Sequence, residues 1–108
     1  MPPATIPATG TTRETSDQHA PLYNVVLLND DDHTAEYVIE MLEKLFAIAE
    51  SQAWKHVIEV DSTGRTIVMT CDLTAAEFGR DQIHAFGADW RIPRCQGSMS
   101  ATVEPCPE

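Results

Sequence analysis

The sequence predicts a small α+β domain, with three helices packed against a three-stranded antiparallel sheet in the order β-α-α-β-α-β. Three observations lead to this fold class. The chain has 108 residues, which suits one domain with one modest core. Its composition, 43% hydrophobic and 22% charged, is ordinary for a soluble globular protein. Aliphatic runs of strand length alternate along the chain with stretches in which apolar residues recur at helical spacing.

The first strand is expected at residues 22–29, where LYNVVLLN is a β-branched and aliphatic run of strand length. From Thr34 the spacing becomes helical. One apolar stripe falls at i, i+3, i+4, i+7 and i+8, namely Val38, Met41, Leu42, Leu45 and Phe46. The pattern breaks at residues 47–51. A second helix should follow, with Ser51 as its N-cap and a buried side made of Ala53, Val57 and Val60.

The second half of the chain alternates in the same way. Gly64 can take the left-handed conformation that ends helices, so the second helix should stop there. Residues 65–71, RTIVMTC, are typical of a second strand. Residues 74–86 predict a third helix, which Gly79 weakens and Gly87 ends. After a loop at residues 88–97, residues 98–105 alternate apolar and polar side chains as a final strand.

The two ends of the chain differ from the folded part at residues 22–105. Residues 1–21 are rich in Pro, Thr, Ala and Ser and have almost no large apolar side chain. Such a stretch cannot bury enough surface to offset its ordering entropy, so we expect a flexible N-terminal arm. This arm has neither the basic region nor the apolar region of a secretory signal. Residues 106–108 are expected to fray.

Charge and cysteine usage limit the possible partners. The chain has 17 Asp and Glu against 7 Lys and Arg, a formal net charge of −10. Phosphate backbones are bound by clustered Lys and Arg, so nucleic acid is not an expected partner. No apolar run approaches the ~20 residues that span a bilayer, so no membrane is expected either. Three cysteines without Cys-x-x-Cys spacing disfavour a disulfide framework and favour the cytoplasm. A monomer is expected for a chain this small and acidic.

The polar run at residues 29–33, NDDDH, directly follows the aliphatic strand and is the main candidate site. It lacks the Gly and the alternate spacing of a calcium loop, so no metal is expected. No Ser or Cys lies in an elbow motif, which disfavours nucleophilic catalysis. Two interpretations remain. The run is either a turn that caps the next helix or a cradle in which Asn29, with Asp30 or Asp31, accepts the N–H donors of an ammonium group.

The stretch YNVVLLNDDDHTAEYVIEMLEKLF, followed by VDSTGRTIV and a late ATVEP, resembles the ClpS family. These proteins are adaptors that deliver N-end-rule substrates to a Clp unfoldase–protease. The similarity covers roughly residues 22–105, and its most specific parts are NDD after an aliphatic strand and EYVI at the opening of the first helix. It implies a binding module without a cofactor, not an enzyme.

The resemblance also implies a ligand and a site. The ligand is an N-degron, a free α-amine on a substrate that begins with Leu, Phe, Tyr or Trp. By this resemblance the α-amine ligands are Asn29, Asp30, Asp31 and Asp61, and the pocket residues are Ala35, Val38, Val57 and Met99. The apolar members of this set would equally suit plain core packing.

Two departures from the family have expected consequences. Asp61 stands where the family usually has a His as the third amine ligand, and a carboxylate can accept the same N–H in a stronger, charge-assisted bond. Ala35 stands where many relatives carry Met. The smaller side chain leaves space near the ligand's β-carbon, which predicts tolerance of Ile or Val as the first residue.

The resemblance further implies docking to a Clp unfoldase of the ClpA or ClpC type through the third helix. The family's Glu and Lys at this surface fall approximately at Thr74 and Gly79, with Glu77 and Arg80 close by. We expect Thr74, Glu77 and Arg80 to form the docking surface and the N-terminal arm to assist delivery. The alternative function is a regulator that docks on the unfoldase without recognising N-degrons.

Overall fold

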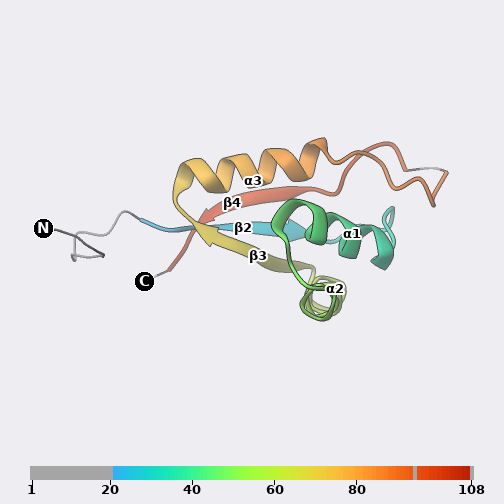
Figure 1. The fold of residues 1–108 in the computed structure, drawn as a ribbon, viewed down its shortest axis with the longest axis horizontal. Coiled ribbons are helices and arrows are strands. Elements are labelled where there is room, and N and C mark those ends of the chain that lie inside the picture. The colour runs from blue at the N-terminus through green and yellow to red at the C-terminus, as the bar shows by residue number, and fades with distance from the viewer. Residues whose placement is uncertain (1–20, 94, 108) are drawn as a thin grey trace, which may run out of the picture.

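The computed structural model of the chain describes residues 21–93 and 95–107. The described residues form three helices and a three-stranded sheet, which confirms the predicted class and order of elements (Figure 1). The elements are β2 (Tyr23–Leu28), α1 (Ala35–Phe46), α2 (Glu50–Thr63), β3 (Arg65–Cys71), α3 (Leu73–Ala85) and β4 (Ala101–Pro105). Apart from Pro21, the expected N-terminal arm lies outside the described residues.

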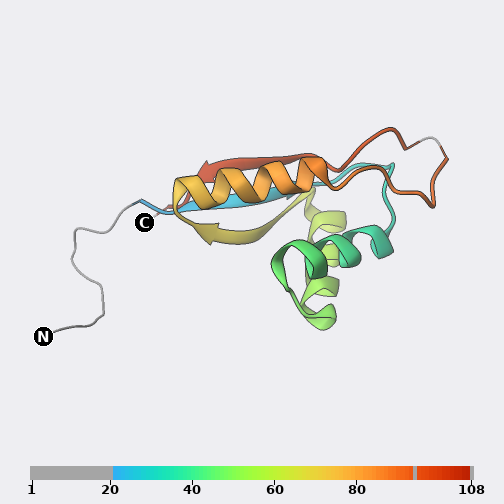
Figure 2. The same ribbon diagram turned by 45° about the horizontal axis from the view of Figure 1, so that its top comes forward.

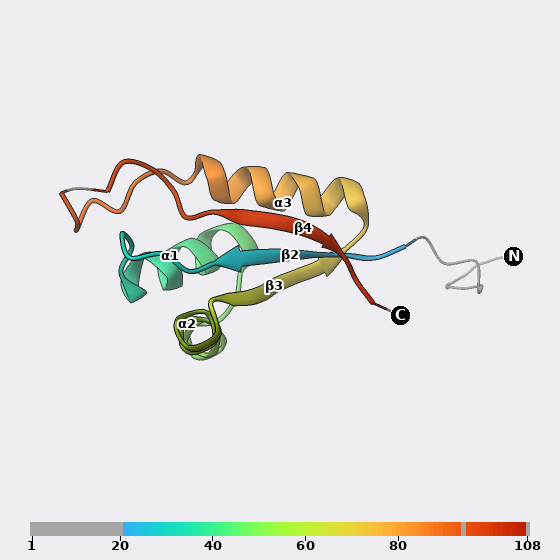
Figure 3. The same cartoon turned by 180° about the vertical axis from the view of Figure 1, so that it is seen from behind.

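The sheet has the order β3-β2-β4, and both neighbours pair antiparallel with β2. Three consecutive residues of this central strand, Val25, Val26 and Leu27, have no exposed area. Figures 1 and 3 show α3 running along the sheet, while α1 and α2 lie at the end where β2 ends and β3 begins. Figure 2 shows the same separation from another side. The residues that follow β2 therefore lie at the same end of the sheet as α1 and α2.

The predicted bounds hold for α1 and β3, and the predicted stop of α2 at Gly64 is confirmed. Strand β2 is one residue shorter at each end than the predicted 22–29. The N-cap of α2 is Ala49, not Ser51, because the chain turns at left-handed Ala47 (φ 54°) and resumes as a helix at Glu50. Glu50, an acidic residue in the first turn of α2, interacts favourably with the positive end of the helix dipole. The third helix begins at Leu73, one residue earlier than expected, since the Asp72 side chain accepts from the Ala75 N–H at 2.9 Å.

The last strand is shorter than expected. Residues 98–100 lie outside β4, because the register pairs Leu27 with Ala101 and β2 ends at Leu28. At the other end, the Cys106 N–H donates to the Leu22 carbonyl at 2.9 Å, so pairing continues one residue into the tail that we expected to fray. Among the described residues, no helix is long and apolar enough to cross a membrane.

Gly79 is part of the core and not of a docking surface. It is buried on α3, and a Cβ at this position would lie 3.3 Å from Phe46 Cε1 and 3.6 Å from Val25 Cγ2. The glycine that seemed to weaken the helix therefore lets α3 approach α1 and the sheet closely. The position equivalent to the family's docking Lys faces inward at this point of the chain.

Candidate functional site

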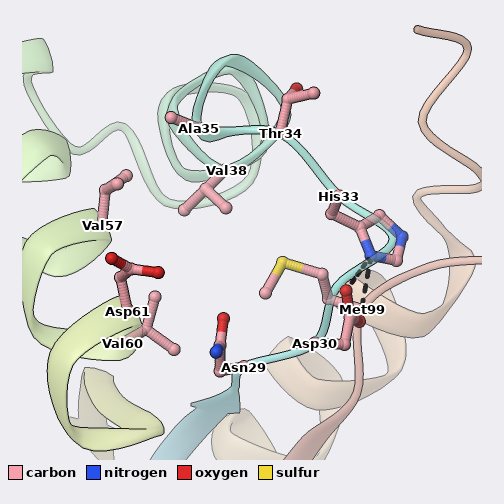
Figure 4. A pocket seen from close by; sticks show the side chains of 10 residues that line it. All are labelled: Asn29, Asp30, His33, Thr34, Ala35, Val38, Val57, Val60, Asp61 and Met99. Carbon is pink, nitrogen blue, oxygen red and sulfur yellow. Dashed lines mark hydrogen bonds and ion pairs between the residues drawn. The ribbon is translucent and has the colours of Figure 1, made fainter. Parts of the chain in front are cut away.

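A cavity of about 250 Å³ lies beyond the end of β2, between the start of α1 and the last turns of α2 (Figure 4). It is lined by Asn29, Asp30, His33, Thr34, Ala35, Val38, Val57, Val60, Asp61 and Met99. Sites for drug-sized ligands usually enclose ~300–1,000 Å³. A cavity slightly below that range suits a ligand as small as a single amino-acid side chain.

Backbone hydrogen bonds fix the frame of this cavity. The Leu28 N–H donates to the Ser100 carbonyl and the Asn29 N–H to the Gly64 carbonyl, each at 3.0 Å. The first bond joins the end of β2 to the segment that carries Met99, and the second joins it to the turn after α2. Three stretches that are distant in sequence therefore meet around residue 29.

The wall of the cavity is apolar. All four predicted pocket residues line it: Ala35, Val38, Val57 and Met99. Val38 and Met99 are almost fully buried, at 4% and 2% exposed. Ala35 and Val38 share one face of α1, and Val57 shares a face of α2 with Val60, as the i, i+3 spacing requires. The same side chains thus contribute to the core and present a surface to the cavity.

The rim of the cavity is acidic. Asn29, Asp30 and Asp61 line it, and Figure 4 shows the Asn29 amide and the Asp61 carboxylate pointing into the space between α2 and the end of β2. Among the lining residues, all of them described, none is Lys or Arg. Asp31, the fourth predicted amine ligand, is exposed and is not among the lining residues. The arrangement can accept several N–H donors of a cation at the mouth of an apolar cavity.

Asp30 is already engaged by the protein itself. One of its carboxylate oxygens accepts from the Asp32 N–H at 2.9 Å and lies 2.7 Å from Nδ1 of His33. Its other oxygen lies 3.0 Å from the same nitrogen. In the sequence, the run at residues 29–33 suggested His33 only as a possible metal ligand. Among residues 21–93 and 95–107, no group of three or more His, Cys, Asp or Glu side chains could hold a metal ion.

Asp89 contacts the cavity-lining residue Thr34, and no motif in the sequence indicates this role. This loop carboxylate is 1% exposed and accepts from the Thr34 N–H at 2.7 Å and the Thr34 hydroxyl at 2.8 Å. It also accepts from the Arg91 N–H at 3.0 Å and from Arg91 Nη1 at 3.2 Å. Burial alone would raise the pKa of Asp89, but the hydrogen bonds from Thr34 and Arg91 lower it to about 2.

Thr34 in turn begins α1. Its side chain accepts from the Tyr37 N–H at 3.1 Å, an N-cap bond. The Tyr37 hydroxyl donates to the Gly87 carbonyl at 2.5 Å, and burial raises the pKa of Tyr37 to about 12. The start of α1, which forms one wall of the cavity, is therefore tied at two points to the loop after α3.

The three predicted docking residues lie together on α3. Thr74 and Glu77 are exposed, and Arg80 is partly buried and lies 3.1 Å from the Asp81 carboxylate. Their spacing of three residues places them on one stripe of the helix, which runs from exposed Thr74 toward the buried side at Arg80. Phe78, which is 63% exposed, lies beside this stripe.

Comparison with known proteins gives one consistent result. The family model described as "ATP-dependent Clp protease adaptor protein ClpS" matches residues 18–91. Named relatives include the ATP-dependent Clp protease adapter protein ClpS of Synechococcus elongatus, 32% identical over 80% of this chain and 80% of that protein. The ClpS of Roseobacter denitrificans is 34% identical over 78% of this chain and 70% of that protein.

A solved structure agrees with these relatives. It is that of Agrobacterium tumefaciens ClpS2 bound to L-phenylalaninamide, with a TM-score of 0.70 and 26% sequence identity. The match covers 82% of this chain and 100% of that one. The family model covers well over half of the residues, and the chain therefore belongs to the ClpS family of adaptor proteins of the ATP-dependent Clp protease.

Proposed function

We propose that this protein is an N-degron adaptor. It binds substrates through a free α-amine and a large apolar first side chain, and it delivers them to a Clp unfoldase–protease. The proposal rests on one observation: an apolar cavity of about 250 Å³ has amide and carboxylate oxygens, from Asn29 and Asp61, at its rim. The proposal makes the protein a binding protein and not an enzyme.

The chemistry of the rim supports an ammonium group as the ligand's polar end. An ammonium has three N–H donors and no acceptor, and the Asn29 carbonyl oxygen and the Asp61 carboxylate are acceptors. The apolar wall of Val38, Val57 and Met99 begins directly beside these acceptors. A ligand that carries an α-amine and an apolar side chain on the same carbon can satisfy both at once.

The solved relative supports the same ligand class. ClpS2 of Agrobacterium tumefaciens was bound to L-phenylalaninamide, which has a free α-amine and an aromatic side chain. The carboxamide of L-phenylalaninamide is chemically equivalent to the first peptide bond of a protein chain. For this chain we infer peptides and proteins that begin with Leu, Phe, Tyr or Trp as ligands.

Delivery requires a second surface, for which we propose the exposed face of α3 with Thr74, Glu77 and Arg80. This face is distinct from the cavity, since none of the three residues lines it. An adaptor needs such a separation, because substrate and unfoldase must be held at the same time. The partner proposed here is the N-terminal domain of a ClpA- or ClpC-type unfoldase.

The proposal is tested by fluorescence anisotropy with two labelled peptides that begin with Leu, one with a free amine and one acetylated. We expect the free peptide to bind and acetylation to weaken binding by about a hundredfold or more. Acetylation removes the charge and two donors, and each charged hydrogen bond contributes ~1.5–3 kcal/mol. Equal binding of both peptides would contradict amine recognition. Binding of neither would favour a regulator that occupies the unfoldase without reading N-degrons.

The size of the side chain at position 35 is expected to decide how well the protein binds peptides that begin with a β-branched residue. In the natural protein, a peptide beginning with Ile should bind within about tenfold of one beginning with Leu, because Ala35 leaves space near the β-carbon. Ala35→Met should weaken the Ile peptide at least tenfold more than the Leu peptide, since a steric mismatch of a methylene or more costs ~1–3 kcal/mol. The same anisotropy assay measures the ratio, and an unchanged ratio would exclude this role for Ala35.

A further inference from the structure

We infer that His33 is the positioning residue of the ligand cavity, acting through the Asp30 carboxylate on one side and the Gly97 carbonyl on the other. Its side chain is only 4% exposed and lies in the loop between β2 and α1. Nδ1 lies 2.7 Å from a carboxylate oxygen of Asp30, and Nε2 lies 2.7 Å from the carbonyl oxygen of Gly97. Figure 4 shows the ring on the Asp30 side of the cavity, with both bonds to Asp30 drawn.

These two contacts place an oxygen acceptor at each ring nitrogen. A carboxylate oxygen and a peptide carbonyl oxygen can only accept, so the ring is the donor in these contacts. The two N···O distances, both 2.7 Å, are hydrogen-bond distances. The ring therefore bridges Asp30 and Gly97.

Two further side chains contact the ring. Tyr37 packs against it with ring centroids 4.5 Å apart. Cys95 Sγ lies 3.3 Å from Nε2, where it can accept a share of the N–H, and it also lies 3.2 Å from the Gly97 carbonyl oxygen. Beyond Thr34, Asp89 is paired with Arg91. The carboxylate that directly touches the ring is therefore that of Asp30.

His33 connects the two sides of the cavity. Asp30 belongs to the acidic rim, and Gly97 precedes buried Met99 of the apolar wall by two residues. Fixing both partners holds the loop after β2 at a set distance from the segment before β4. The ligand's ammonium is then left to Asn29 and Asp61, with Asp30 held away as part of the frame.

The inference rests on the proposed function, and three variants of the full chain test it. His33→Asn keeps a donor near the position of Nδ1, and His33→Gln keeps one near the position of Nε2. We expect His33→Ala and His33→Gln to weaken the free-amine Leu peptide about tenfold, because a charged hydrogen bond is lost from the rim. His33→Asn, which keeps a donor to Asp30 but loses the Gly97 contact, should weaken binding less, by about threefold.

If His33 only filled space, His33→Asn and His33→Gln would weaken binding equally. A smaller loss in His33→Asn than in His33→Gln would therefore indicate positioning through Asp30. Equal affinity of all three variants and the natural protein would overturn the inference. Tighter binding by His33→Ala would also overturn it, since Asp30 would then be a ligand that His33 obstructs. Unfolding curves of each variant identify any that fails to fold, and such a variant is replaced by His33→Thr.

A second measurement needs no peptide and therefore distinguishes failure of this inference from failure of the proposed function. Amide hydrogen exchange followed by NMR reports the Asp32 N–H, which donates to the Asp30 carboxylate that His33 holds. We expect this amide to exchange at least tenfold faster in His33→Ala than in the natural protein, while an amide of central strand β2 is unchanged. Equal exchange of the Asp32 amide in both proteins would overturn the inference even if the Leu peptide binds. Faster exchange in His33→Ala, with no peptide binding to the natural protein, would support His33 as the residue that positions the loop and reject only the N-degron assignment.

Discussion

Asp61→Ala is expected to weaken binding of a free-amine Leu peptide by about tenfold or more. Asp61 lines the cavity from α2, and its carboxylate points into the space where the ammonium would lie (Figure 4). A hydrogen bond to a charged group contributes ~1.5–3 kcal/mol, and Asp61 is exposed, so we take the lower end of that range. Because the Asp30 carboxylate is hydrogen-bonded to His33, we expect that Asp30 does not replace the acceptor that the substitution removes.

Two controls make the Asp61 result interpretable. Asp61→His restores the residue that the family usually carries and should keep the affinity within about threefold, because a neutral imidazole nitrogen can also accept an ammonium N–H. Glu43→Ala removes the same charge from an exposed site on α1 that does not line the cavity, and should leave the affinity unchanged. A similar loss in Glu43→Ala would mean that the overall charge of −10, and not Asp61, attracts the peptide.

The salt dependence gives a further check on Asp61. A carboxylate–ammonium contact at an exposed rim is screened as the Debye length falls from ~10 Å at 0.1 M salt to ~3 Å at 1 M. The natural protein should therefore lose more affinity with added salt than Asp61→His does. Identical salt slopes would show that Asp61 makes no direct ionic contact with the ligand.

The fold was predictable because its signals are local. The aliphatic run of β2 and the apolar stripe of α1 each follow the periodicity of one element, and both elements were located to within about a residue or two. The errors fall where a tertiary contact decides the boundary. The N-cap of α2 is Ala49 and not Ser51, because the left-handed turn at Ala47 lets the helix begin earlier. Residues 98–100 lie outside β4, because β2 ends before it could pair with them.

The residues that hold the cavity in place were not predictable, because their partners are distant in sequence. The resemblance supplied the lining residues Ala35, Val38, Val57 and Met99, which all line the cavity. Nothing in the sequence relates Asp89 to Thr34 across 55 positions, or His33 to Gly97 across 64. Each of these bonds depends on how the loop after α3 folds back on the start of α1, and loops carry no periodic signal.

Asp89→Ala is expected to lower the free energy of unfolding by about 3 kcal/mol, the largest stability effect of any single change discussed. The substitution removes an acceptor with almost no exposed area from four hydrogen bonds. It leaves the Thr34 N–H without its acceptor and deprives Arg91 of its closest carboxylate. Breaking a buried, hydrogen-bonded charge pair typically costs ~3–5 kcal/mol, and Arg91 keeps a second acid, Glu40, at 3.7 Å. Urea unfolding followed by circular dichroism measures the change.

The pH dependence identifies the ionised carboxylate as the source of this stability. The hydrogen bonds lower the pKa of Asp89 to about 2, below the ordinary value of ~3.9 in an unfolded chain. Its contribution is therefore present above about pH 4 and is lost as the pH falls from 4 toward 2. Asp89→Asn should match the natural protein near pH 2 and fall below it at pH 6. Asp81→Ala, which removes an exposed acid from α3, should change stability by less than ~0.5 kcal/mol. If Asp89→Asn and the natural protein differ equally at both pH values, shape and not charge holds Thr34 at the start of α1.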